Sequence, residues 1–194
     1  MNLRISKSWQ WSSGMVLEGD FAINHYDATV DMTTQTDDEV EHSIALDRQH
    51  WWFINVMQDA VLMHDASPLL VPYQQTGQRI VALPYLPVDH VILIMLYCKL
   101  NAIMDHRITV NNISLCSSRG DRVIYSHGID DDDLEFQVDG WWCENLASWA
   151  NNVQKSSPDS IISLERLPHW HDLGLSWPSV DQSSSVVDFR DGKK

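Results

Sequence analysis

The stretch from Pro87 to Asp105 constrains the fold more than any other part of this chain. No residue from Val91 to Cys98 is charged or carries an amide, so a helix here would be apolar on all sides and enclosed by protein. Proline is favoured in the first turn of a helix, where its missing N–H would be unpaired anyway. The apolar run is too short to span a membrane, which takes about 20 residues. It therefore predicts a buried central helix.

The segments around this helix show the patterns of strands, turns and a second helix. Apolar alternation predicts strands over 3–11 and 108–115, with a bulge at 111–112. β-Type residues predict a strand over 21–34, a short apolar run predicts one over 79–83, and 123–125 is a returning strand. Ser12–Gly14 is typical of a turn. Thr36 and Glu39 match a capping box, which predicts a helix over 37–63.

This order of elements predicts an α+β fold. We expect a single domain over 1–155, with a mostly antiparallel sheet and two main helices packed on one face. A ferredoxin-like arrangement is one candidate among several. Residues 156–194 differ in composition and predict a C-terminal appendage, partly extended, that either lies over the domain or docks on something else.

Charge and cysteine content limit the function classes. The formal net charge is −14, which argues against a nucleic-acid or anionic-membrane binder, because both need a basic face. Three widely spaced cysteines, Cys98, Cys116 and Cys143, indicate free thiols in a reducing compartment. The N-terminus has no apolar core of a secretory signal. We therefore expect a cytosolic protein.

Nine tryptophans in 194 residues are the clearest pointer to binding. Tryptophan is common in interface hot spots, although it also fills cores. The predicted contact residues are Trp141, Trp142, Trp170 and Trp177, and an acidic run that would steer a basic partner consists of Asp130, Asp131, Asp132 and Asp133. The alternative for the acidic run is a solvated loop.

His169, His171 and Asp172 are the candidate metal ligands. In an extended segment the two imidazoles face the same way, and with the carboxylate they could hold zinc or iron. A further ligand would have to come from elsewhere in the chain. The alternative is a pair of surface histidines. The sequence has no Gly-x-Ser-x-Gly, P-loop or Gly-x-Gly-x-x-Gly motif, and no cofactor is predicted.

Several segments together resemble a known group of proteins. These are residues 86–128 followed by Gly140-Trp141-Trp142, with residues 21–36 and 44–48. The chain, over about residues 15–142, is similar to small uncharacterised proteins encoded by large tailed bacteriophages, notably those of marine bacteria. That family has no established activity or catalytic residues. The resemblance implies a location in the cytoplasm of an infected bacterium or in the virion.

The leading hypothesis is a non-catalytic phage protein that binds another protein, as an infection-stage accessory factor or a minor virion component. One alternative is a small metal-dependent hydrolase or nuclease that uses the His-x-His-Asp cluster. Another is an acidic nucleic-acid mimic, whose carboxylates would imitate phosphates over one face. The sequence identifies neither the partner nor the oligomeric state.

Overall fold

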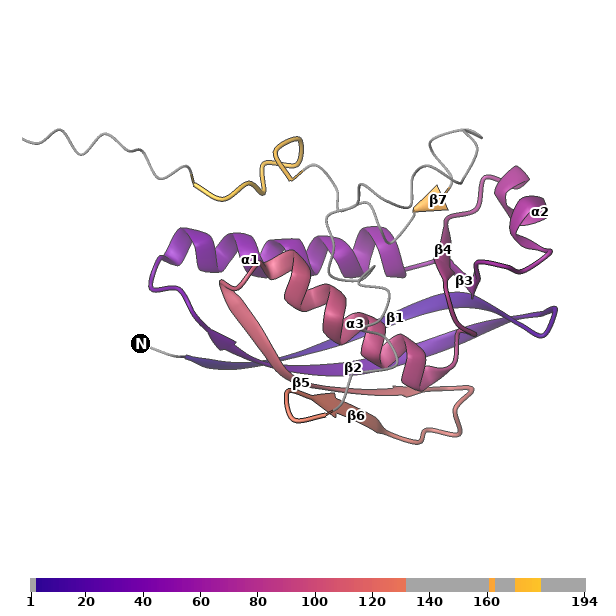
Figure 1. Cartoon of the computed structure of the whole chain (residues 1–194), viewed down its shortest axis with the longest axis horizontal. Coiled ribbons are helices and arrows are strands. Elements are labelled where there is room, and N and C mark those ends of the chain that lie inside the picture. Colours follow the sequence, from indigo (N-terminus) through magenta and orange to yellow (C-terminus); the bar gives the residue numbers. More distant parts are fainter. Residues whose placement is uncertain (1–2, 132–160, 163–169, 179–194) are drawn as a thin grey trace, which may run out of the picture.

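A mixed sheet forms the centre of the computed structural model, which describes residues 3–131, 161–162 and 170–178 (Figure 1). The strand order is β6-β5-β2-β1-β3-β4-β7. The strands are β1 (Arg4–Leu17), β2 (Asp20–Thr34), β3 (Val61–His64), β4 (Ile80–Leu83), β5 (Ile108–Ser117), β6 (Tyr125–Gly128) and β7 (Ile161–Ile162). The helices are α1 (Glu39–Trp52), the π-helix η1 (Phe53–Met57), α2 (Leu70–Gln75) and α3 (Asp89–Met104). The predicted α+β domain with a mostly antiparallel sheet is confirmed.

Strands β1 and β2 form one long antiparallel hairpin. Glu18 and Gly19 connect them with positive φ angles of 52° and 93°, as in the two-residue turns that match the twist of a hairpin. The turn predicted at Ser12–Gly14 is therefore wrong. These residues lie inside β1 and pair with residues 23–25 of β2. Their small side chains suit a turn, but the pairing of the long hairpin decides their conformation.

The helix predicted over 37–63 is wrong beyond residue 57. Helix α1 passes into η1, and the backbone then turns at Asp59, which has a φ of 58°. Val61–His64 is a strand, parallel to both β1 and β4. A strand buried on both faces is continuously apolar, so its sequence resembles that of a buried helix.

Asp38, and not the predicted Thr36, caps α1. Its Oδ1 accepts hydrogen bonds from the backbone N–H groups of Val40 (2.7 Å) and Glu41 (3.3 Å). We expect Asp38→Ala to lower the free energy of unfolding by about 1 kcal/mol, because two N–H groups lose their acceptor. Urea denaturation measures this. Glu39→Ala removes an exposed acid from the same turn and should lower the free energy of unfolding by only about 0.3 kcal/mol. Equal losses in the two variants would contradict the assignment.

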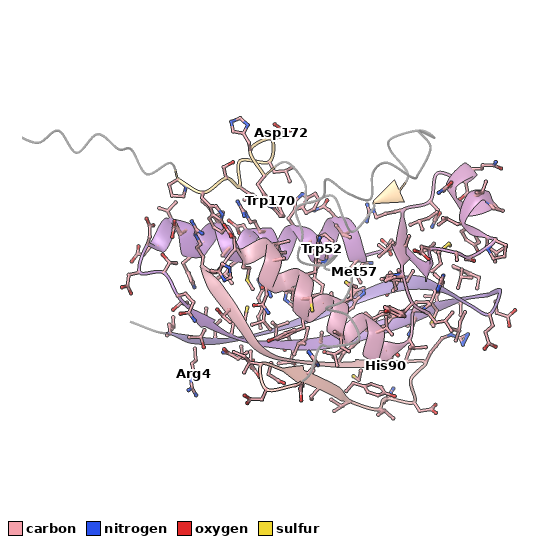
Figure 2. The ribbon with its side chains drawn as sticks, viewed as in Figure 1. Arg4, Trp52, Met57, His90, Trp170 and Asp172 are labelled. Carbon is pink, nitrogen blue, oxygen red and sulfur yellow. The ribbon has the colours of Figure 1, made fainter. Side chains whose placement is uncertain are left out.

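The predicted central helix, α3, is confirmed as enclosed. Most of its residues are buried, including every position from Val91 to Cys98 except Ile94. Helices α1 and α3 cover one face of the sheet, and Trp52 and Met57 lie in the layer between α1–η1 and the strands (Figure 2). Among the described residues, no helix is long and apolar enough to cross a membrane.

The two faces of the antiparallel strands differ in chemistry. On the helix-covered face β1, β2 and β5 carry large apolar side chains, such as Trp11, Val30 and Ile113. The other face, called the open face below, carries alternate small polar side chains: Ser6, Ser8, Gln10, Ser12, His25, Asp27, Thr29, Asp31, Thr33, Thr109, Asn112, Ser114 and Cys116. In Figure 1 the two long helices, α1 and α3, lie on the side of these strands opposite to the open face. This alternation is typical of an antiparallel sheet with one solvated face.

The strand pairings test three further predictions from the sequence: the bulge, the ferredoxin-like arrangement and the appendage. The predicted bulge is confirmed, because Asp31 pairs with Asn112 and Met32 with Val110, which leaves Asn111 as the extra residue. A ferredoxin-like fold would begin with strand–helix–strand, whereas this chain begins with two paired strands. From the predicted appendage, β7 pairs with β4.

Candidate functional site

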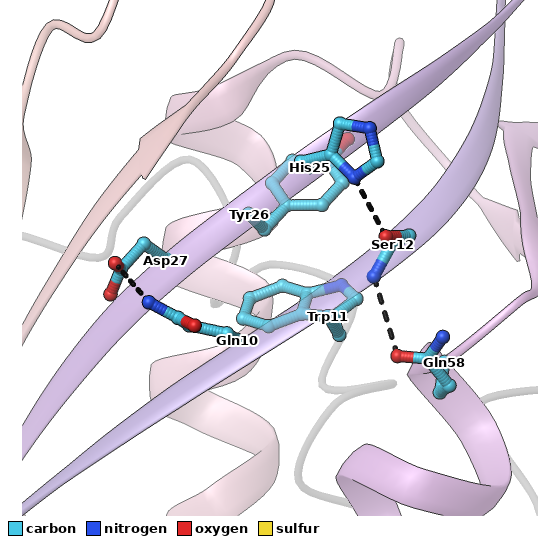
Figure 3. Close-up of a pocket in the computed structure, with 7 residues that line it drawn as sticks. All are labelled: Gln10, Trp11, Ser12, His25, Tyr26, Asp27 and Gln58. Carbon is cyan, nitrogen blue, oxygen red and sulfur yellow. Dashed lines mark hydrogen bonds between the residues drawn. The ribbon is translucent and has the colours of Figure 1, made fainter.

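A pocket of about 390 Å³ is lined by residues of the paired strands β1 and β2 and by Gln58 at the end of η1 (Figure 3). Its size is within the range of small-ligand sites, about 300–1,000 Å³. The lining residues are Gln10, Trp11, Ser12, His25, Tyr26, Asp27 and Gln58. Four of these, Gln10, Ser12, His25 and Asp27, belong to the open face, and Gln58 follows the end of η1.

The register of the hairpin sets the polar groups of the pocket. Gln10 lies opposite Asp27 and Ser12 opposite His25. The Gln10 amide donates to Asp27 Oδ2 (2.9 Å), and Ser12 Oγ lies 2.7 Å from His25 Nδ1. Directly opposed side chains on an antiparallel pair are close enough to interact across the strands. In each pair, the side chain on β1 and the side chain on β2 therefore hold each other in place.

Gln58 is placed by the end of the π-helix. Its backbone N–H donates to Phe53 O (2.9 Å), which closes the wide turn, and Arg79 donates to its carbonyl (2.8 Å). Its side-chain oxygen accepts from the Ser12 N–H (3.3 Å), and its side-chain nitrogen donates to Asp59 (2.8 Å). π-Helical turns occur often at functional sites. Here the turn brings an amide side chain to the edge of β1.

The chemistry of the pocket suits recognition better than catalysis. A serine beside a histidine has the spacing of a nucleophile and its base, but such a pair also needs a group that orients the base. Among the described residues, no carboxylate bonds to the second ring nitrogen of His25. Burial raises the pKa of Tyr26, so this phenol stays neutral beneath the pocket. Hydroxyl, imidazole, amide and carboxylate groups together offer both donors and acceptors.

An apolar patch adjoins the pocket on the same face. Ile23, two residues from His25 along β2, is 61% exposed, and Phe21 is also exposed. The Phe21 ring lies against Gly14, where an added Cβ would collide with it, and its centroid is 6.0 Å from that of Tyr73 on α2. Below, the docking surface means this patch, Phe21, Ile23 and Tyr73, together with the pocket.

The acidic run and the tryptophan pair of the sequence prediction are only partly described. Trp141, Trp142, Asp132, Asp133 and the candidate ligand His169 lie outside the described residues. Asp130 and Asp131 follow β6, and Asp131 accepts a hydrogen bond from the Gly128 N–H (2.7 Å) and lies 3.9 Å from His127 Nδ1. Asp131 therefore helps to close its own turn.

The described residues of the predicted appendage lie near α1. Trp170 packs edge-on against Trp51, with ring centroids 5.7 Å apart, and Trp177 lies over Arg48. His171 and Asp172 are exposed, 3.6 Å apart, and Asp172 points away from the domain in Figure 2. In the described part of the chain, no group of three or more potential metal ligands exists.

The comparisons with known proteins show a likeness to solved structures. No family model matches the chain, and no curated protein is similar to it. Among solved structures, the chain resembles the uncharacterized protein WS1659 from Wolinella succinogenes at 10% identity and a TM-score of 0.46, over 67% of this chain and 99% of that one.

Proposed function

We propose that this chain is a non-catalytic protein that binds another protein through the docking surface. The observation that carries the proposal is an exposed apolar patch directly beside a pocket of hydrogen-bonding side chains, on the sheet face opposite α1 and α3. Protein interfaces commonly combine apolar anchors with polar groups around them. Ile23 would be the anchor, and the Ser12–His25 pair would supply hydrogen bonds at its side.

The charge of the open face favours a protein partner over the alternatives. Its carboxylates within β1, β2 and β5 are Asp27 and Asp31, and Asp27 is already bonded to Gln10. A nucleic-acid mimic would need carboxylates spread over a face, so the open face does not support that alternative. The metal-dependent hydrolase likewise gains no support from His171 and Asp172, whose side chains are exposed and do not line the pocket.

The resemblance to phage proteins suggests where the partner is found. We infer an infection-stage accessory factor in the cytoplasm of an infected bacterium, or a minor component of the virion. Mass spectrometry of purified virions distinguishes the two, because only a virion component is recovered with the particle in a fixed proportion.

The partner itself is found by affinity capture from infected cells and then tested as a purified pair. We expect Ile23→Asp to raise the dissociation constant at least tenfold, because a carboxylate in the apolar centre of an interface has to be desolvated. Isothermal titration calorimetry measures the constant.

The matched control is Ile124→Asp. Ile124 is 68% exposed and lies before β6, outside the docking surface. It should leave the affinity unchanged. Equal effects of the two substitutions, or an unchanged affinity in Ile23→Asp, would rule out the docking surface as the binding site.

A further inference from the structure

The segment Trp170–Pro178, called the strap below, has a shape that its own hydrogen bonds define. The Leu175 N–H donates to Trp170 O (2.8 Å), and the Gly174 N–H donates to His171 O (3.1 Å). Gly174 has a φ of 68°. This combination of a 6→1 bond, a 5→2 bond and a left-handed glycine is a Schellman motif. The turn is therefore held by hydrogen bonds within the strap and does not depend on contacts with the domain.

Two arginines of the domain contact the tryptophan rings of the strap. The guanidinium carbon of Arg48 lies 3.7 Å from the ring centroid of Trp177 and 4.7 Å from that of Trp170, and that of Arg107 lies 4.6 Å from Trp177. Guanidinium groups bind aromatic faces at such distances. Trp51 contacts Trp170 edge-on. Below, Arg48, Trp51, Asp105 and Arg107 are called the receiving site.

Hydrogen bonds fix the strap at two points. Arg48 donates from Nε to Leu175 O (2.8 Å), and Trp177 donates from Nε1 to Asp105 (2.9 Å). Arg48 also donates to Ile103 O at the end of α3 (3.1 Å). Arg48 is only 4% exposed, and burial lowers its pKa to about 10, so it stays charged at neutral pH. A buried charge needs partners, and the strap supplies one carbonyl and two ring faces.

We propose that the receiving site binds peptides and that its occupant is the strap, held as a ligand of the chain's own domain and released as one unit. Three features support this. The strap's turn is preformed, it contacts the receiving site through two tryptophans and one carbonyl, and both tryptophans remain partly exposed. The site takes a segment with tryptophans seven positions apart around a glycine-ended turn.

The test uses a labelled synthetic peptide of residues 169–178 and the full chain. A tethered ligand competes at an effective concentration of about millimolar for short linkers, so the wild-type chain should bind the peptide weakly. The full-chain variant Trp170→Ala/Trp177→Ala removes the strap's two ring contacts with the receiving site, and we expect it to bind the peptide at least tenfold more tightly by fluorescence anisotropy. Leu173→Ala, which changes an exposed strap residue, should behave as wild type.

A second variant keeps the test decisive if the double variant does not fold. Gly174→Ala strains the strap's turn but touches nothing in the domain, since no atom lies within 4 Å of its added Cβ. We expect the Gly174→Ala chain to bind wild-type peptide about fivefold more tightly than the wild-type chain does, and to bind a Gly174→Ala peptide about fivefold more weakly than wild-type peptide. Equal binding by wild type and both variants, or no binding by a folded double variant, would overturn the proposal.

Discussion

Replacing Phe53 with alanine should lower the free energy of unfolding by about 3–5 kcal/mol, the usual loss for a buried aromatic side chain. Phe53 is 1% exposed and begins η1. Its ring stacks on Trp9, with centroids 4.6 Å apart, and tilts against Trp11 at 5.2 Å. The substitution leaves a cavity between η1 and the first strand, which large rigid indole rings are poorly able to fill.

The neighbouring Ile54→Ala is the matched control, because Ile54 belongs to the same helical turn but is 49% exposed. Its loss should be below about 1 kcal/mol. Urea denaturation followed by circular dichroism measures both variants. If Phe53→Ala costs no more than Ile54→Ala, the aromatic stack between η1 and β1 does not hold the two elements together.

The prediction is correct for elements whose sequence pattern fits only one kind of secondary structure. The 87–105 stretch is apolar on every side of a helix, and α3 is enclosed as expected. The strand at 79–83 and the bulge beside Asn111 follow from local signals as well. In each case the local pattern and the tertiary environment favour the same structure, so tertiary contacts had nothing to override.

The errors arose where two structures share one pattern. Val61, Leu62 and Met63 continue the apolar spacing of α1, yet they form a strand because β1 and β4 flank them. Ser12–Gly14 has the composition of a turn, but the β1–β2 hairpin extends through it to Glu18 and Gly19. A strand partner distant in sequence leaves no local signal.

The candidate site was missed for the same reason. The pocket needs Ser12 opposite His25, and a predicted turn at Ser12 removes that register. It also needs Gln58, which the prediction placed inside a helix. The only local signal was the polar alternation of Gln10 and Ser12 with that of His25 and Asp27, which indicates an exposed face but not which residues meet.

Gly120→Ala should lower the free energy of unfolding by about 2–3 kcal/mol, the loss typical of a side chain forced into filled space. An added Cβ would collide with Asp89 Oδ2 and lie 3.2 Å from Ser117 Oγ. Both neighbours are fixed. Asp89 is buried at the start of α3 and accepts a hydrogen bond from Ser117 Oγ (2.7 Å), which in turn accepts one from the Gly120 N–H (3.0 Å).

The collision with Asp89 can be separated from other effects on the turn by a double-mutant cycle. Asp89→Ala alone should cost about 1–3 kcal/mol, because it leaves the buried Ser117 hydroxyl without its acceptor. It also clears the space that the new methyl group needs. The double variant should therefore be more stable than the sum of the two losses predicts, by more than about 1 kcal/mol. Additive losses would show that Gly120 is required for its backbone and not for its closeness to Asp89. A large coupling would show that this turn and the first turn of α3 pack as one unit, which ties the β5–β6 edge of the sheet to the central helix.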